Sequence, residues 1–125
     1  MKTLLAFDTD GVFKMYYETQ TEQVKSFSGP VDPRLISKWF DVDNTFVVVV
    51  SESPYYPKNP DGQPMFPVIN DGANREANLR KAVIYAGGAD FKIYVSDNGW
   101  DKKDAQNAGF IYVDINDFMR MINTK

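Results

Sequence analysis

The sequence predicts an α/β fold in which helices cover both faces of a central parallel sheet. Four short apolar runs, at residues 4–7, 46–50, 91–95 and 110–113, have the length of strands. None alternates as a half-exposed strand would, so the runs are typical of strands buried on both faces. Helical patterns lie between the runs, as in a sheet built from parallel crossovers. With 125 residues, the chain has the size of one domain, and a single domain over residues 1–125 is expected.

The expected helices are marked by caps and by apolar stripes at helical spacing. Asp32 and Pro33 open the first, as N-cap and first helical residue. Asn116 is expected to cap the last, and glycines are expected to end the second and third. The second, third and fourth helices are expected over residues 76–86, 102–108 and 116–122.

Two segments do not fit the alternation of strands and helices. Residues 14–28 alternate partly between polar and apolar side chains, and a β-hairpin projecting from the sheet is expected there. Residues 52–74 contain five prolines and are expected to form a long loop with a short strand within 65–69. Loops of this length in a compact domain are usually functional or flexible.

Composition removes several classes of chemistry. The chain has no Cys and no His, which excludes disulfides, thiolate metal sites and every Ser-His triad. Any general acid or general base must therefore be a carboxylate, a Lys or a Tyr. The net charge is −3 without a block of Lys or Arg, so duplex nucleic acid is not an expected partner.

The amino-terminal apolar stretch stops at Asp8, short of the about seven to fifteen apolar residues of a signal sequence. No stretch approaches the about 18 apolar residues of a membrane span. A soluble, cytoplasmic protein without a membrane partner is therefore expected.

Acidic and hydroxyl side chains follow three of the predicted strands. Asp8 and Asp10 follow the first, Ser51 follows the second, and Asp97 and Asp101 follow the third. In open α/β sheets, ligands bind beyond the carboxyl ends of the strands, where these groups would converge. Crowded carboxylates need a cation, and an oxygen-only donor set suits Mg²⁺. The chemistry indicated is phosphoryl transfer or hydrolysis.

Each acidic segment also has a structural explanation. Asp-Thr-Asp-Gly and Asp-Asn-Gly are both good turn sequences, and one Asp after a strand is more often a cap than a ligand. The coincidence of three strand ends favours the functional interpretation.

These segments resemble motifs of the haloacid dehalogenase superfamily. Segment 4–12 (LLAFDTDGV) resembles the first motif, a strand followed by Asp-x-Asp-Gly, and segment 47–51 (VVVVS) resembles the second. Segment 96–101 (SDNGWD) is similar to the fourth motif, with Ser96 in place of the usual Gly. The resemblance implies a three-layer Rossmann-like fold with a hairpin flap at 14–28.

The third motif departs from the family pattern. The family usually carries Lys at the start of the helix before the fourth motif, and here that position holds Arg75. Arg keeps the charge but presents a planar fork instead of a point charge. Lys58, Arg80 and Lys81 are the reserve candidates for this role.

The resemblance implies an Mg²⁺-dependent phosphatase that forms an aspartyl-phosphate on Asp8. Asp10 would protonate the leaving group and activate water, while Ser51 and Arg75 would bind the phosphoryl group. The implied metal ligands are Asp8, Asp10, Asp97 and Asp101.

The intervals between motifs are too short for a folded cap domain. Capless members of the family act on large substrates or form oligomers in which a neighbouring subunit covers the site, so a homo-oligomer is among the expected arrangements. The expected substrate is phosphorylated, and a sugar phosphate, a nucleotide and a macromolecule are its open alternatives. Tyr55, Tyr56 and Phe66 of the proline-rich loop either contact that substrate or pack the loop onto the core.

Two other functions stay open. The departures at Arg75 and Ser96 favour a catalytically weak or inactive module that keeps the fold and binds metal. A receiver-like phospho-acceptor is also α/β with acidic strand ends, but it carries its acceptor Asp on a middle strand, whereas here the middle strand along the chain ends in Ser51.

Overall fold

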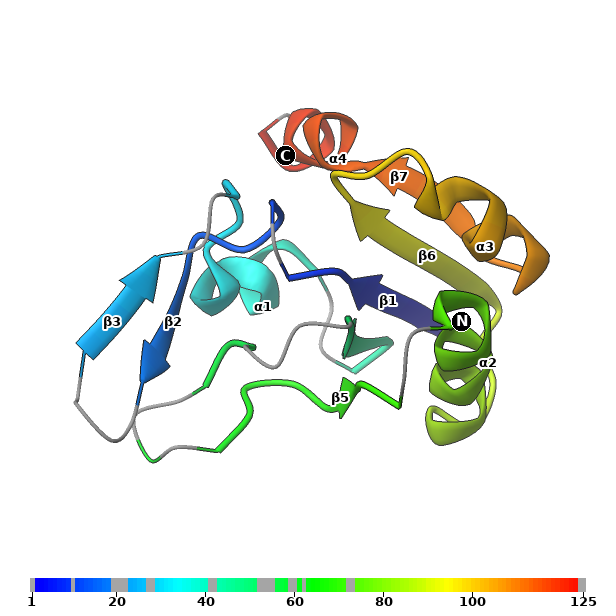
Figure 1. Cartoon of the computed structure of the whole chain (residues 1–125), viewed down its shortest axis with the longest axis horizontal. Coiled ribbons are helices and arrows are strands. Elements are labelled where there is room, and N and C mark those ends of the chain that lie inside the picture. The colour runs from blue at the N-terminus through cyan, green and yellow to red at the C-terminus, as the bar shows by residue number, and fades with distance from the viewer. Residues whose placement is uncertain are drawn as a thin grey trace.

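The main sheet has five parallel strands in the order β5-β4-β1-β6-β7 within the described part of the chain (Figure 1). The computed structural model describes residues 2–9, 11–18, 23–26, 29–40, 43–51, 56–58, 61, 63–71 and 74–123. The α/β fold with a central parallel sheet is therefore confirmed. The strands are β1 (Thr3–Phe7), β4 (Thr45–Val50), β5 (Val68–Ile69), β6 (Phe91–Ser96) and β7 (Ile111–Asp114).

Four α-helices lie within the same described residues. They are α1 (Ile36–Trp39), α2 (Arg75–Tyr85), α3 (Asp101–Asn107) and α4 (Ile115–Asn123). The first predicted helix divides in two, because the 3-10 turn η1 (Pro33–Leu35) precedes α1.

The central strand β1 contributes to two core clusters, because its successive side chains point to opposite faces. Leu4 and Ala6 join a first cluster that includes Leu79 and Ala82 of α2 and Ala105 of α3. On the other face, the second cluster holds residues of β1, α1 and α4, namely Leu5, Phe7, Ile36, Ile115, Phe118 and Ile122. Side chains on both faces of β1 are thus removed from water, which explains the unbroken apolar run in the sequence.

The predicted glycine ends of the helices are confirmed, but one predicted N-cap is not. Gly87 has φ +74° after α2, and its N–H and that of Gly88 donate to the carbonyls of Ile84 and Val83. The predicted Asn116 cap of α4 is wrong. Because α4 begins at Ile115 directly after β7, the carboxylate of Asp114 caps it instead, accepting the Asn116 N–H at 2.9 Å.

Asp32 caps η1 as the sequence predicts. Its Oδ1 accepts the Arg34 N–H at 3.0 Å, and its carboxylate pairs with the Arg34 guanidinium at 2.7 Å. The hydrogen bond from the Arg34 side chain is the main reason why the pKa of Asp32 lies below its usual value of 3.8.

Replacing Asp32 with alanine is expected to cost about 1 kcal/mol of unfolding free energy at neutral pH, the usual value of an N-cap. A carboxyl whose pKa is lowered by folding contributes stability above 3.8, and this stability is lost as the pH falls through the lowered pKa. The difference between the two proteins should therefore shrink in acid. Denaturant titrations of both proteins at neutral and at acidic pH measure this difference in unfolding free energy. An equal difference at the two pH values would contradict the assignment of Asp32 as the cap.

A two-stranded antiparallel sheet follows β1. It pairs β2 (Met15–Glu18) with β3 (Gln23–Ser26), and Figure 1 shows it on the side toward which the arrowheads of β1 and β6 point. Backbone hydrogen bonds close its base, from Lys14 N–H to Val31 O at 2.7 Å and from Gly29 N–H to Phe13 O at 3.0 Å. The remaining residues of the predicted hairpin, 19–22 and 27–28, lie outside the described residues.

The proline-rich loop is described in part. Tyr56 and Phe66 are partly buried and pack against the second cluster, which favours packing over substrate contact for these two side chains. The short strand expected within 65–69 is β5, which runs parallel to β4. Tyr55 lies outside the described residues. No helix in the described part of the chain is long and apolar enough to cross a membrane.

Candidate active site

The carboxyl edge of the sheet, around its central strand, carries the predicted site residues that the structure describes. Phe7 at the end of β1 pairs with Val49 of β4 and with Val95 of β6, so the residues that follow the three strands lie side by side. Counted along the chain, the five parallel strands have the order 3-2-1-4-5. The order reverses at β1, and such a switch point is where open α/β sheets bind ligands.

Asp8 is a nearly buried carboxylate at this switch point, with 9% of its surface exposed. Its N–H donates to Val95 O at 3.0 Å, which continues the pairing with β6 by one residue. Its Oδ1 accepts the Thr9 N–H at 2.8 Å, and the Ser51 hydroxyl hydrogen-bonds to the same carboxylate. These contacts fix the carboxylate in one orientation.

Two hydroxyls lie beside Asp8. The Oγ1 of Thr9 and the Oγ of Ser51 are 2.8 Å apart, and both residues are buried. Thr9 was not among the predicted site residues. Nothing in the sequence pointed to Thr9, the residue between Asp8 and Asp10, because its contact with Ser51 depends on the pairing of β1 with β4.

Arg75 joins two of the predicted carboxylates. Its Nη1 is 3.6 Å from Asp8 Oδ1, and its Nε is 3.3 Å from Asp101 Oδ1. The arginine reaches the site because α2 begins there, with the Asn74 side chain capping the Ala77 N–H at 3.0 Å. Burial acts to lower the pKa of Arg75, but Tyr94, Asp8 and Asp101 outweigh it and raise the pKa above its usual value.

The reserve candidates for this cation make contacts elsewhere. Arg80 lies 3.4 Å from Glu76 and donates to Asn107 O, and Lys81 lies 3.2 Å from Asp71. The ammonium of Lys58 lies 5.0 Å from the centre of the Tyr56 ring. Among the four candidates, Arg75 is thus the one whose contacts with Asp8 the structure shows.

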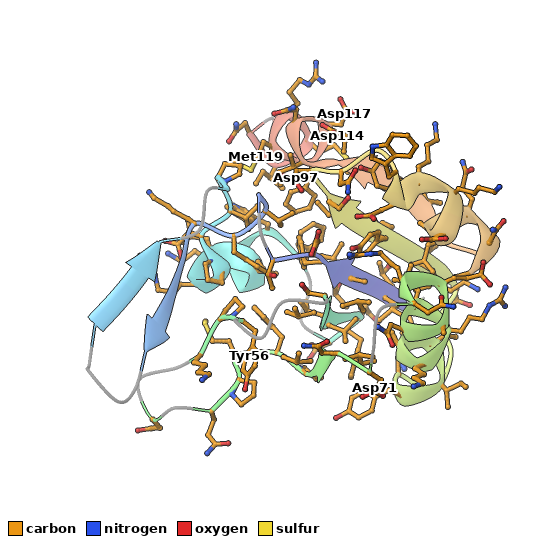
Figure 2. The ribbon with its side chains drawn as sticks, in the orientation of Figure 1. Tyr56, Asp71, Asp97, Asp114, Asp117 and Met119 are labelled. Atoms are coloured by element: carbon orange, nitrogen blue, oxygen red, sulfur yellow. The ribbon has the colours of Figure 1, made fainter. Side chains whose placement is uncertain are left out.

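The turn after β6 carries Asp97 and Asp101 in different surroundings. Asp97 is exposed at the tip of β6 (Figure 2), and its carboxylate lies against Gly11, leaving no room for a side chain there. Asp101 begins α3, is buried and faces Arg75. The Ser96 hydroxyl accepts the Asn98 N–H at 3.2 Å, and this contact holds the turn in place.

A divalent cation was predicted at Asp8, Asp10, Asp97 and Asp101. Asp10 lies outside the described residues, and within those described no three acidic side chains are grouped as a metal site. The Asp97 carboxylate lies against Gly11, close to Asp8 in the chain, and the oxygens of Asp8 and Asp97 fit the hard-ligand preference of Mg²⁺. Asp101 instead faces the guanidinium. The four-carboxylate metal site stays a prediction.

The protonation of Asp8 reflects opposing influences. Burial raises its pKa above the usual 3.8 and is the largest cause. The positive charge of Arg75 and the hydrogen bonds from Thr9 and Ser51 act in the opposite direction, while the nearby charge of Asp101 raises the pKa further. An additional cation would favour the ionised carboxylate.

Replacing Gly11 with alanine is expected to displace Asp97. Gly11 has φ +76°, which L-residues rarely adopt, and a methyl group there would overlap the Asp97 carboxylate. Calorimetric titration with Mg²⁺ should show binding weakened about tenfold or more, in the range found when the surroundings of metal ligands are disturbed. Gly99→Ala is the matched control, because the space around Gly99 is open. Equal Mg²⁺ affinity in Gly11→Ala and the parent would contradict a role for Asp97.

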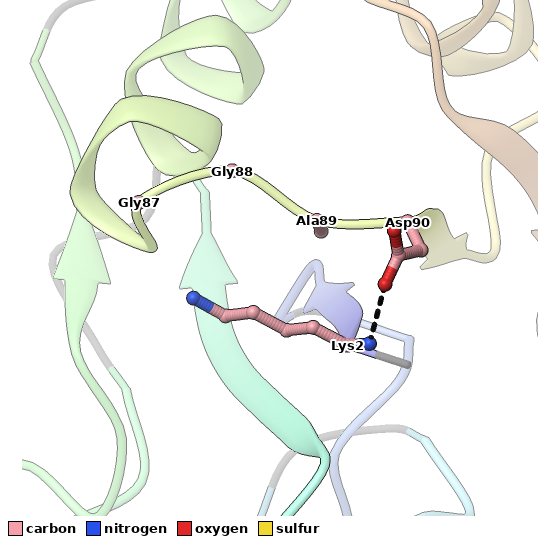
Figure 3. A pocket seen from close by; sticks show the side chains of 5 residues that line it. All are labelled: Lys2, Gly87, Gly88, Ala89 and Asp90. Atoms are coloured by element: carbon pink, nitrogen blue, oxygen red, sulfur yellow. Dashed lines mark hydrogen bonds between the residues drawn. The ribbon is translucent and has the colours of Figure 1, made fainter.

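A shallow pocket lies at the opposite, amino edge of the sheet (Figure 3). It is lined by Lys2 and by residues 87–90. The Lys2 N–H donates to Asp90 Oδ2 at 2.8 Å, and its ammonium donates to Ala86 O at the end of α2. These contacts join β1 to the loop before β6, and none of the predicted site residues borders the pocket.

The geometry defines an α/β protein with a buried aspartate, an arginine and two hydroxyls at the switch point of its sheet. No protein-family model matches the chain, and no curated protein or solved structure matches it either. The argument for function therefore rests on the site.

Proposed function

We propose that the chain is a haloacid dehalogenase-like phosphatase that hydrolyses phosphoric monoesters with Mg²⁺ through an aspartyl-phosphate on Asp8. The observation that carries this proposal is the position of Asp8 at the switch point, with Oδ1 held by the Thr9 N–H and by Arg75. A carboxylate nucleophile needs this fixed orientation and a nearby cation for the phosphoryl oxygens.

The proposed reaction has two steps. Oδ2 of Asp8 attacks phosphorus, the bond from phosphorus to the ester oxygen breaks, and the leaving alcohol takes up a proton. Water then attacks the aspartyl-phosphate, releasing inorganic phosphate and restoring the carboxylate. Asp10, outside the described residues, takes the acid–base role by the family resemblance.

The groups beside Asp8 match what a phosphoryl group needs. The Ser51 hydroxyl and its neighbour Thr9 provide hydrogen-bond donors, and Arg75 provides a planar cation. Asp8 and Asp97, with Asp10, would hold Mg²⁺. The ion would neutralise negative charge on the phosphoryl oxygens during transfer.

The arrangement of the strands supports the finer assignment of the fold. The order 3-2-1-4-5 corresponds to the Rossmann order and differs from the 2-1-3-4-5 of receiver-like sheets, which argues against a receiver. We assign a three-layer Rossmann-like fold to the chain and treat the β2–β3 sheet as a flap next to the nucleophile. The proposal treats the site as capless, because the segments between the motifs are too short for a folded cap domain.

A panel of phosphoric monoesters tests this function. It should include an aryl phosphate, sugar phosphates, nucleotides and a phosphopeptide, each assayed with Mg²⁺ and with excess chelator. We expect release of inorganic phosphate that stops when Mg²⁺ is removed. Hydrolysis that is indifferent to the chelator would overturn the proposed metal requirement.

A metal-binding module without turnover is the second candidate. The specific observation in its favour is that Arg75 already contacts both Asp8 and Asp101, so that its guanidinium is engaged by carboxylates in the absence of a phosphoryl group. This candidate predicts calorimetric Mg²⁺ binding together with no phosphate release across the panel.

A further inference from the structure

Tyr94 is a fully buried tyrosine whose hydroxyl lies at the candidate site. It belongs to β6, and its side chain is 0% exposed. The Nη1 of Arg75 donates a hydrogen bond to this hydroxyl, and the hydroxyl lies 3.5 Å from the carbonyl oxygen of Val50. A buried tyrosine hydroxyl needs hydrogen-bond partners, and here they are the site arginine and the end of β4.

We propose that Tyr94 is the positioning residue for Arg75, and that its hydroxyl fixes the guanidinium between Asp8 and Asp101. The catalytic consequence rests on the proposed phosphatase function, whereas the positioning itself does not. No predicted role was attached to Tyr94, which was one aromatic residue within an apolar run.

The orientation of the guanidinium follows from contacts at two of its nitrogens. Nε faces Asp101 at 3.3 Å, while Nη1 faces Asp8 at 3.6 Å and also donates to Tyr94. A guanidinium is a rigid planar fork, so contacts at both nitrogens determine its plane as well as its position. Its central carbon lies 5.7 Å from the centre of the Tyr94 ring, which places the whole group against this side chain.

This geometry accounts for an arginine where the resemblance leads one to expect a lysine. The ammonium of lysine is a compact point charge without a planar fork, so it cannot reproduce the contacts made by Nε and Nη1 together. Burial, followed by the negative charge of Asp8, raises the pKa of Tyr94 well above its usual value. The hydroxyl therefore keeps its proton at neutral pH, where it accepts from Arg75 and donates toward Val50.

Tyr94→Phe removes only the hydroxyl and keeps the ring in the core. We expect kcat/KM for the best ester of the panel to fall about ten- to hundredfold, as when a reacting group is misplaced by about 1 Å. The loss should appear mainly in kcat, because substrate still meets Ser51 and Mg²⁺. Tyr85→Phe is the matched control, since Tyr85 is an exposed tyrosine near the end of the same helix as Arg75, and its kcat/KM should be unchanged.

A readout independent of turnover is the mobility of the Arg75 side chain. ¹⁵N relaxation of its Nε–Hε group should show an ordered side chain in the parent and in Tyr85→Phe, and a mobile one in Tyr94→Phe. If no ester is hydrolysed by any variant and Arg75 still loses its order in Tyr94→Phe, the positioning role holds and the phosphatase proposal has failed. An ordered Arg75 in Tyr94→Phe would overturn the positioning role.

Arg75→Lys tests the same pair from the other side. If Tyr94 acts through the guanidinium, adding Tyr94→Phe to Arg75→Lys should lower kcat/KM by less than about threefold, because coupled residues are not additive. Should Tyr94→Phe not fold alone, Arg75→Lys is the variant that tests the proposal. We expect its kcat/KM to fall about tenfold or more, because a reacting group is again misplaced. Parental kcat/KM in Arg75→Lys would overturn the proposal.

Discussion

Asp8→Asn is expected to abolish phosphate release, lowering kcat by at least about a thousandfold, as is usual when a catalytic nucleophile is removed. Asparagine keeps the shape of the side chain but supplies no carboxylate oxygen to attack phosphorus. Steady-state assays with the best ester of the panel measure the loss. Asp43→Asn is the matched control, because Asp43 is exposed shortly before β4, at the opposite edge of the sheet.

The same variant should remain folded and become more stable near neutral pH. Burial raises the pKa of Asp8 above 3.8, so ionised Asp8 opposes folding despite its contacts with Arg75 and Thr9. A group whose pKa is raised by folding contributes stability below its unfolded pKa, and this contribution is lost as the pH rises through the folded value. Asparagine avoids that loss, so its advantage in unfolding free energy should grow as the pH rises above 3.8.

Thermal unfolding at a series of pH values measures this trend. A gain in stability together with a loss of activity is typical of residues that serve a site at the expense of the fold. Full activity in Asp8→Asn would refute covalent catalysis at this residue. If Asp8→Asn loses activity because it unfolds, the stability prediction is wrong.

Arg75→Met has the second largest expected effect, and it falls on both stability and catalysis. It leaves Asp8 and Asp101 without the cation that lies 3.6 Å and 3.3 Å from their oxygens. Removing one partner of a largely buried ion pair costs about 3 kcal/mol of unfolding free energy. We also expect kcat/KM to fall by about two to three orders of magnitude, as when a preorganised donor to the reacting group is lost.

Denaturant titrations and steady-state assays measure the two effects. Arg80→Met is the matched control, because Arg80 is exposed on the same helix and pairs with Glu76 outside the site. Arg75→Met and Arg80→Met with equal stability and equal kcat/KM would show that Arg75 has no special role at the carboxyl edge.

The strands and the candidate carboxylates could be predicted because local sequence determines them. The unbroken apolar run of β1 reflects burial on both faces, and parallel pairing then brings the ends of β1, β4 and β6 together. Asp8, Ser51 and Asp97 are placed by this pairing alone. The start of α2 was expected one residue late, and Asn74 provides its cap.

The partners of these groups could not be predicted, because they depend on how helices pack on the sheet. The contact of Asp101 with Arg75 brings together the first residues of two different helices. Thr9 meets Ser51 across two paired strands, and Tyr94 of β6 meets Arg75 of α2, the helix packed beside the sheet. The one available signal was the hydroxyl of Tyr94 within an apolar strand, since a buried hydroxyl requires a partner.

The central claim is that Asp8 accepts a phosphoryl group with the help of Mg²⁺. The most direct measurement is ¹⁹F NMR of the protein with beryllium fluoride, a mimic of a phosphoryl group bound to a carboxylate. We predict a protein-bound fluoride resonance that requires Mg²⁺, is present in Asp43→Asn and is absent in Asp8→Asn. A resonance that persists in Asp8→Asn, or no bound resonance in the parent at saturating Mg²⁺ and beryllium fluoride, would contradict the claim.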